Sequence, residues 1–302
     1  WPLLQPLLVG VWIAYLVVLA GWIVLQKREP IATLSWLLSL AALPVVGLVI
    51  YHFLGPQRIR RQQLRRARAR AGLGDSLPAG LKPSDDGATL ARLGQASTGF
   101  AASTATRAEL LVGGAATFDA LLAAIAGATH HLHLEYYILE PDQTGTAIRD
   151  ALAARARAGV RVRLLLDALG SSRIGKRFLA PLRDAGAEVA WFHPARLRFI
   201  ARPRVNLRNH RKLVVVDGAL AFTGGINLTD EQDVRRCAAA YHDLHLRLEG
   251  EVVHWLQLAF LEDWHYATGV ALRAPALFPE ATHGPVEAQV LPAGPDSPWE
   301  PI

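Results

Sequence analysis

Methionine is missing from all 302 residues, including position 1, and cysteine occurs once, at Cys237. Because a complete reading frame starts with Met, we expect this sequence to be cut from a longer one. A single cysteine excludes an internal disulfide and a zinc site built from cysteines, and Cys237 is interpreted as a structural thiol that fits a reducing compartment. Charged residues are also scarce, at 19% against 51% hydrophobic residues. This balance is more apolar than that of an average soluble domain, which predicts that part of the chain lies in a membrane.

Two long apolar runs open the sequence, over residues 3–25 and 31–54. Each exceeds the roughly 20 residues that a helix needs to cross the hydrocarbon core of a bilayer. The short charged segment between them ends at Pro30, so we predict a two-helix transmembrane hairpin over residues 1–55. A signal peptide is the alternative for the first run, but the second run follows at once and no small-residue cleavage pattern separates the two.

The second run is followed by seven arginines, which are Arg58, Arg60, Arg61, Arg65, Arg66, Arg68 and Arg70. They outweigh Lys27 and Arg28 in the turn of the hairpin, which predicts a cytoplasmic C-terminal part. Beside a bilayer, each arginine would gain about 1 kcal/mol from anionic lipid, although the tract could also serve only as a topology signal. A nucleic-acid patch would suit the sequence pI of about 9.8, but the position beside the spans favours the membrane, and no nucleic-acid partner is expected.

The rest of the chain divides by composition and periodicity. Residues 56–104 are predicted to be a basic juxtamembrane segment and a linker, because residues 72–103 are rich in Gly, Ala, Ser, Pro and Asp. Residues 105–275 alternate β-rich apolar runs with segments of helical spacing, which is typical of a layered α/β domain. The expected strands are 132–139, 160–167, 188–192, 212–217, 220–223 and 244–248, and the expected helices are 118–128, 146–158, 176–185 and 252–266.

Residues that could carry chemistry concentrate between positions 208 and 227, in the skeleton H-x-K-x4-D-x6-G-G-x-N. The period of two along a strand places His210 and Lys212 on one face and points Leu213 and Val215 the other way, into the core. The negative charge of a phosphodiester repels nucleophiles. A cation beside an attacking imidazole would bind the substrate and offset the charge that develops in the transition state. The pair therefore predicts chemistry on a phosphate ester.

The remaining fixed residues of the skeleton are Asp217, Gly224, Gly225 and Asn227. A Gly224-Gly225 turn would let the backbone approach phosphate oxygens with no Cβ in the way, and Asn227 would add a neutral donor. Each residue alone also has an ordinary structural explanation. Six identities at fixed spacing on a strand and turn, however, indicate one site.

Two other kinds of catalytic site have less support. His130, His131 and His133 could begin a metal cluster. Alternate histidines on a strand are weak support without H-E-x-x-H or Cys-rich spacing, so no metal is predicted. A serine nucleophile is not supported either, because the sequence has no G-x-S-x-G elbow.

The skeleton resembles the HKD motif of the phospholipase D superfamily. Residues 27–55 further resemble the N-terminal membrane segment of bacterial cardiolipin synthases, and residues 133–138, 158–171, 209–213 and 222–228 resemble the first catalytic repeat of that family. The resemblance implies a pseudo-symmetric enzyme of two phospholipase D-like α/β/α lobes, each supplying one HKD motif to a shared cleft. It also implies a multi-pass protein of the bacterial inner membrane.

The resemblance implies two-step covalent catalysis without a metal or another cofactor. His210 would attack a phosphatidyl phosphorus to form a phosphohistidine, while the histidine of the second motif protonates the departing alcohol and later deprotonates the acceptor. The donor would be phosphatidylglycerol and the leaving group glycerol. The acceptor would be a second phosphatidylglycerol, with phosphatidylethanolamine or water as the alternatives.

The same resemblance implies supporting roles for two carboxylates, Asp217 and Asp243. Asp217 would sit behind the reacting atoms and support them by charge and hydrogen bonding. Asp243 would hold the second ring nitrogen of the nucleophile, although Tyr241 stands where the family has Trp. Glu135 and Asp167 stand at strand ends and could line the cleft.

Only one H-x-K-x4-D occurs in the sequence, whereas the implied chemistry needs two. Residues 276–302 look like the opening of a second lobe, so we expect the second motif to lie beyond Ile302 and the chain to be inactive alone. The alternatives are a phosphodiesterase or nuclease that dimerises around one motif, and a non-catalytic membrane module. The expected partners are phosphatidylglycerol, anionic membrane lipid and a second HKD lobe, from a missing half or from a dimer mate.

Overall fold

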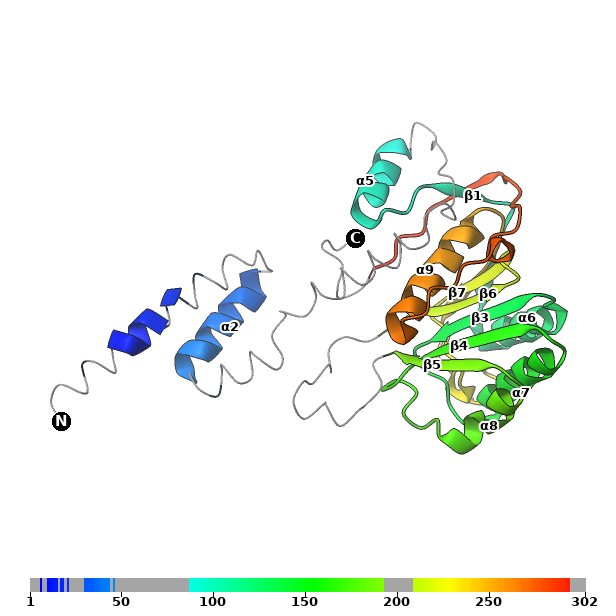
Figure 1. The fold of residues 1–302 in the computed structure, drawn as a ribbon, viewed down its shortest axis with the longest axis horizontal. Coiled ribbons are helices and arrows are strands. Elements are labelled where there is room, and N and C mark those ends of the chain that lie inside the picture. Colours follow the sequence, from blue (N-terminus) through cyan, green and yellow to red (C-terminus); the bar gives the residue numbers. More distant parts are fainter. Residues whose placement is uncertain are drawn as a thin grey trace. The chain divides into compact units, whose positions relative to one another are not determined.

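The chain forms two compact units in the computed structural model, which describes residues 6, 10–15, 17–18, 21, 30–43, 46, 87–192 and 209–293 (Figure 1). The smaller unit comprises Trp1–Arg58 and Arg196–Asn206. The larger unit comprises Ile59–Ala195 and Leu207–Ile302 and contains the HKD skeleton.

The described part of the smaller unit contains helix α2 (Pro30–Ala42). Leu40 is buried there against Tyr15, Trp36 and Leu37. Among the described residues, no helix has both the length and the apolar character that a membrane crossing requires. Much of the predicted hairpin and the whole arginine tract lie outside the described residues, so both stay predictions.

The larger unit is built on a seven-stranded mixed sheet. Its strands, in spatial order, are β2 (Arg107–Val112), β8 (Leu244–Glu249), β7 (Leu220–Gly224), β6 (Lys212–Val216), β3 (His131–Tyr136), β4 (Arg161–Asp167) and β5 (Glu188–Phe192). The strands β3, β4 and β5 run parallel, and all other neighbours are antiparallel. The central strands are rich in Leu and Val because both faces of the sheet are covered.

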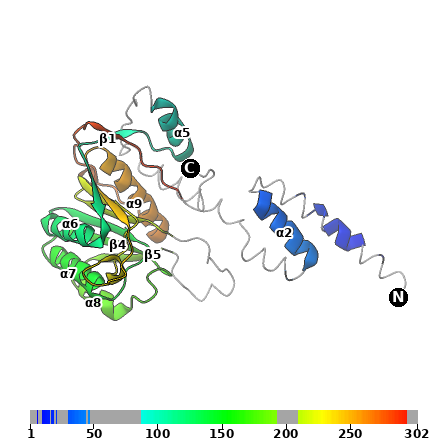
Figure 2. The ribbon, with the colours of Figure 1, turned by 180° about the vertical axis from the view of Figure 1, so that it is seen from behind.

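Helices cover the sheet on both faces, as Figures 1 and 2 show. One face carries α6 (Gly113–Gly127), α7 (Gln143–Arg157) and α8 (Lys176–Asp184), and the other carries α9 (Val252–Thr268). Strand β6 serves both layers: Val214 and Val216 join the core under α6 to α8, whereas Leu213 and Val215 join the core under α9. The predicted α/β/α layering of this lobe is confirmed, as is the inward direction of Leu213 and Val215.

Several short elements differ from the sequence-based expectation. The helix α5 (Ala88–Thr98) lies within the segment predicted to be a linker. The strands β1 (Ser103–Ala105) and β9 (Val286–Ala288) form a separate antiparallel pair, and short 3-10 helices occur at η3 (Asp230–Gln232) and η4 (Pro275–Leu277). The described part of the segment expected to open a second lobe, up to residue 293, thus has contacts with this lobe. Leu277 is buried in the core under α9, and β9 continues into Gln289, which donates to the carbonyls of Ala91 and Phe100.

Candidate active site

His210 and Lys212 lie close together at the start of β6. His210 lies two residues before the strand and is exposed, and Lys212 is the first residue of the strand. The Lys212 ammonium donates a hydrogen bond of 2.8 Å to the His210 carbonyl oxygen. Tyr137 accompanies both, because its ring stacks on the His210 imidazole at 3.9 Å between centroids and lies 5.4 Å from the Lys212 nitrogen.

The ammonium of Lys212 is partly withdrawn from water. Burial lowers its pKa from 10.5, and the nearby Asp243 carboxylate opposes this shift. A partly desolvated cation interacts more strongly with an anion than a fully hydrated one does. Lys212 is therefore suited to bind a phosphate group beside the imidazole.

Asp243 packs against the Gly-Gly turn that ends β7. A Cβ added at Gly225 would lie 2.0 Å from Oδ1 of Asp243, and one added at Gly224 would lie 2.5 Å from the carbonyl oxygen of Leu244. The amide of Gly225 donates to that same carbonyl at 2.9 Å. These glycines are thus required by the close approach of the segment that begins β8, and their predicted contact with phosphate stays a prediction.

Asn227 and Asp243 line one cavity of about 520 Å³. The backbone amide of Ile138 donates to Oδ1 of Asn227 at 3.2 Å, which leaves the amide nitrogen of that side chain as the donor end. Most other lining residues are polar: Glu140, Asp142, Arg173, Thr229, Asp230, Glu231, Gln232, Tyr241 and His242. The structure thus brings Asn227 and Asp243 together, with Asp243 also close to Lys212.

Asp217 lies at the other end of β6. At about 3.3 Å per residue, the five positions from Lys212 to Asp217 span about 16 Å. Its carboxylate accepts hydrogen bonds of 2.8 to 2.9 Å from the backbone amides of Thr129, His130 and His131. Burial raises the pKa of Asp217, but these bonds outweigh it and lower the pKa below 3.8. The structure therefore places Asp217 at the start of β3, away from His210 and Lys212 and not behind them as expected.

A family model described as "Cardiolipin synthase, PLD-like domain" matches residues 121–264, which run from within α6 to within α9. The chain is 36% identical to a cardiolipin synthase from Geobacillus sp. (strain WCH70) over 95% of its own length and 59% of that protein. It is 41% identical to cardiolipin synthase 1 from Bacillus anthracis over 86% of its length and 53% of that protein.

Residues 121–264 form a PLD-like domain of the cardiolipin synthase family. The chain spans between half and three-fifths of the length of these two relatives. Among solved structures, phosphatidylserine synthase from Haemophilus influenzae Rd KW20 matches with a TM-score of 0.44 at 15% identity, covering 72% of this chain and 44% of that one.

Buried carboxylates hold Asn209, the residue that precedes His210. The backbone amide of Asn209 donates to Asp167 at 3.1 Å. Its side-chain nitrogen donates to Glu135 and, at 3.4 Å, to Asp263. Glu135 and Asp167 were expected to line the cleft, but both are buried and instead hold the segment that carries His210.

Arg211 fixes the other side of His210. Its guanidinium pairs with Asp263 on α9, whose side chain is fully buried, and its amide donates to the side-chain oxygen of Asn209 at 3.0 Å. Burial and the adjacent Asp263 raise the pKa of Glu135 well above 4.5. This shift favours the neutral form of Glu135 in the folded protein, beside the ion pair of Arg211 with Asp263. Sequence reasoning missed this clamp because its parts come from distant elements.

His245 on β8 is a second residue that sequence reasoning did not connect with the site. It is 1% exposed, and the register places it opposite Gly224. Burial and Lys212 lower its pKa to about 4, although Asp243 opposes them. Neither ring nitrogen has a hydrogen-bond partner among the described residues. Asp243 and His245 alternate along a predicted strand, and this spacing could have indicated that His245 lies near the site.

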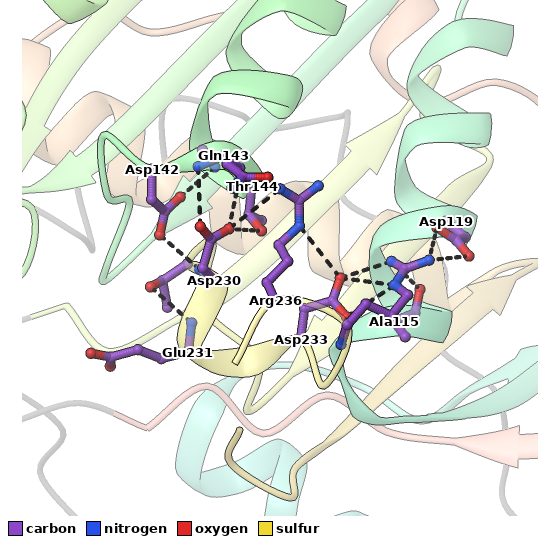
Figure 3. Close-up of polar contacts among 12 residues, drawn as sticks. Ala115, Asp119, Asp142, Gln143, Thr144, Asp230, Glu231, Asp233 and Arg236 are labelled. Atoms are coloured by element: carbon purple, nitrogen blue, oxygen red, sulfur yellow. Dashed lines mark hydrogen bonds and ion pairs between the residues drawn. The ribbon is translucent and has the colours of Figure 1, made fainter. Parts of the chain in front are cut away.

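A polar network holds the loop between Asn227 and β8 in place (Figure 3). Asp142 caps α7 through Gly145 and also accepts from the amide of Asp230 at 2.7 Å. In return, Asp230 accepts from the amide and the hydroxyl of Thr144 at 2.8 and 2.7 Å. These reciprocal caps join the N-terminus of α7 to η3 and fix one wall of the cavity.

The three histidines of the possible metal cluster have other contacts. His131 and His133 are fully buried in β3. The ring of His133 stacks on Phe260 at 4.4 Å and contacts the side-chain nitrogen of Gln257 at 2.7 Å. Within the described residues, no group of three or more His, Cys, Asp and Glu side chains is arranged to hold a metal ion.

Proposed function

We propose that this chain supplies one HKD half-site of a phosphatidyltransferase that makes cardiolipin from two molecules of phosphatidylglycerol and releases glycerol. The observation that carries the proposal is the placement of His210, Lys212 and Asp243 around one end of β6, within a domain of the cardiolipin synthase family. The second motif would come from a further lobe or from a dimer mate. The chain alone is expected to be inactive.

The first chemical step would transfer the phosphatidyl group to the protein. A nitrogen of His210 attacks phosphorus, an N–P bond forms, and the bond from phosphorus to the glycerol oxygen breaks. The histidine of the second motif gives its proton to that oxygen, so glycerol leaves neutral. Lys212 and the side-chain amide of Asn227 would offset the charge on the phosphate oxygens during this step.

The second step would reverse the roles. The second histidine removes a proton from the headgroup hydroxyl of another phosphatidylglycerol. That oxygen attacks phosphorus, an O–P bond forms, the N–P bond breaks, and cardiolipin is released. Asp243 would hold the N–H of the His210 ring, so that the other nitrogen presents its lone pair.

The apolar N-terminal runs and the arginine tract support a location at the bacterial inner membrane. A hairpin over residues 1–55 would anchor the lobe, and the basic tract would hold the lobe at the cytoplasmic surface, where anionic lipid is the substrate.

The test is a turnover assay on the complete gene product that contains this chain, in phosphatidylglycerol vesicles, with both lipid and glycerol measured. The His210→Ala variant should lose both products, whereas His283→Ala, at a 60% exposed side chain outside the site, should keep them. Phosphatidic acid alone would make the protein a phospholipase D. Turnover that survives His210→Ala, or no lipid turnover at all, would overturn the proposal.

A further inference from the structure

The ring of Tyr137 lies almost parallel to the imidazole of His210. Their centroids are 3.9 Å apart, and the planes meet at 18°. The same ring faces the ammonium of Lys212 at 5.4 Å. Tyr137 therefore contacts both residues on which the proposed phosphate chemistry depends, although it belongs to the segment after β3 and not to the HKD skeleton.

The turn after β4 supports Tyr137 from behind. A Cβ at Gly170 would lie 2.2 Å from the carbonyl oxygen of Tyr137 and 2.8 Å from both Cδ2 and Cε2 of its ring. Only glycine fits this contact without displacing the ring. The hydroxyl of Ser171 donates to the same carbonyl at 3.1 Å, which fixes the backbone of Tyr137 as well.

One buried carboxylate connects this turn to the segment of the histidine. Oδ1 of Asp167 accepts from the amides of Leu169 and Gly170 at 3.0 and 2.9 Å. Its Oδ2 accepts from the amide of Asn209 at 3.1 Å. The support behind the Tyr137 ring and the residue before His210 are thus held by the same side chain.

We propose that Tyr137 is a positioning residue whose ring fixes the plane of the His210 imidazole. The χ2 torsion of histidine is broad, so the backbone conformation does not by itself set the plane of the ring. Flat stacking restricts that rotation, whereas a carboxylate such as Asp243 fixes the direction of the N–H. The inference rests on the proposed function for its kinetic consequence, because an in-line attack on phosphorus needs a fixed nitrogen lone pair.

The experiment compares Tyr137→Phe, Tyr137→Leu and Gly170→Ala with wild type, with Leu169→Ala as the control in the same turn. Protein labelled with ¹³C-histidine gives the ring signals, and His210→Ala assigns those of His210. In wild type, Tyr137→Phe and Leu169→Ala, the stacked aromatic ring should shift the His210 ring protons upfield. In Tyr137→Leu this shift should disappear, and in Gly170→Ala it should shrink.

Turnover of phosphatidylglycerol by the complete gene product then tests the consequence. Tyr137→Leu should lower kcat by about tenfold to 100-fold with little change in KM, and Tyr137→Phe should restore it. Unchanged His210 signals in Tyr137→Leu would overturn the inference whether or not the protein turns over lipid. Lost shifts with unchanged kcat would also overturn it. If no lipid is turned over by wild type, the proposed function fails, and the spectra still decide whether Tyr137 orients the ring.

Discussion

Replacement of Arg211 by Met should destabilise the catalytic lobe strongly. The change removes the guanidinium that pairs with Asp263, a fully buried carboxylate, and leaves a negative charge beside Glu135. Breaking a buried ion pair from one side costs about 3 to 5 kcal/mol. Because the side chain of Arg211 is 20% exposed, water screens part of the charge, and the lower end of that range applies. For a lobe of this size, a loss of about 3 kcal/mol lowers Tm by roughly 6 to 12 °C.

The double variant Arg211→Met with Asp263→Leu separates charge from packing. It removes both partners, and apolar replacement of a whole buried ion pair is often neutral. We expect the double variant to regain more than half of the Tm that Arg211→Met loses. The measurement is thermal unfolding followed by tryptophan fluorescence at pH 7. Arg107→Met, at an exposed pair with Glu109, is the control and should cost under about 1 kcal/mol. The reasoning is refuted if Arg211→Met costs no more than the control, or if the double variant is less stable than the single one.

Three further outcomes are expected. The raised pKa of Glu135 means that the folded state keeps a proton that the unfolded state loses, so stability should fall as pH rises above about 4.5. In a series of Tm measurements against pH, Glu135→Gln should remove this contribution to the fall. His131 and His245 have pKa values lowered from 6.5 to about 4, so stability should fall as pH drops through this window, by up to about 1.4 kcal/mol per pH unit and proton. In His245→Leu the fall of stability with pH should be less steep, and an unchanged slope would contradict the assignment. Asp217 has φ of 53°, so Asp217→Ala should lower Tm more than Asp217→Asn, because Asn tolerates this backbone conformation and keeps one acceptor; equal losses would contradict this.

Much of the lobe could be predicted from the sequence because its signals are local. The strand at 188–192 and the start of the helix at Val252 agree with the structure. In contrast, β2 was missed because only Leu111 among its six residues is buried, so no alternation marks it. Its hydrogen bonds to β8 define it, and these depend on a distant segment. The helix α5 was missed because its Ala, Gly and Ser composition is also typical of linkers.

The site shows the same division. Spacing alone predicted His210 beside Lys212, because only one residue separates them in the chain. Spacing could also have separated Asp217 from them, since a strand of that length carries it about 16 Å away. The contacts of Asn209 with Asp263 and of Tyr137 with His210 join segments that the tertiary fold alone brings together. No local pattern indicates such contacts.

The edge of the sheet imposes an order on folding. Strand β2 pairs with β8, so Arg107 lies opposite Glu249. During synthesis β2 is made well before β8, so it cannot form its pairing at first. Pairing the two strands closes a loop of roughly 140 residues, and this closure carries an entropy cost that no local contact offsets. Such non-local pairing slows folding. Asp243 comes just before β8. A nascent chain therefore lacks both this carboxylate and the last strand of the seven-stranded sheet until most of the lobe has been made.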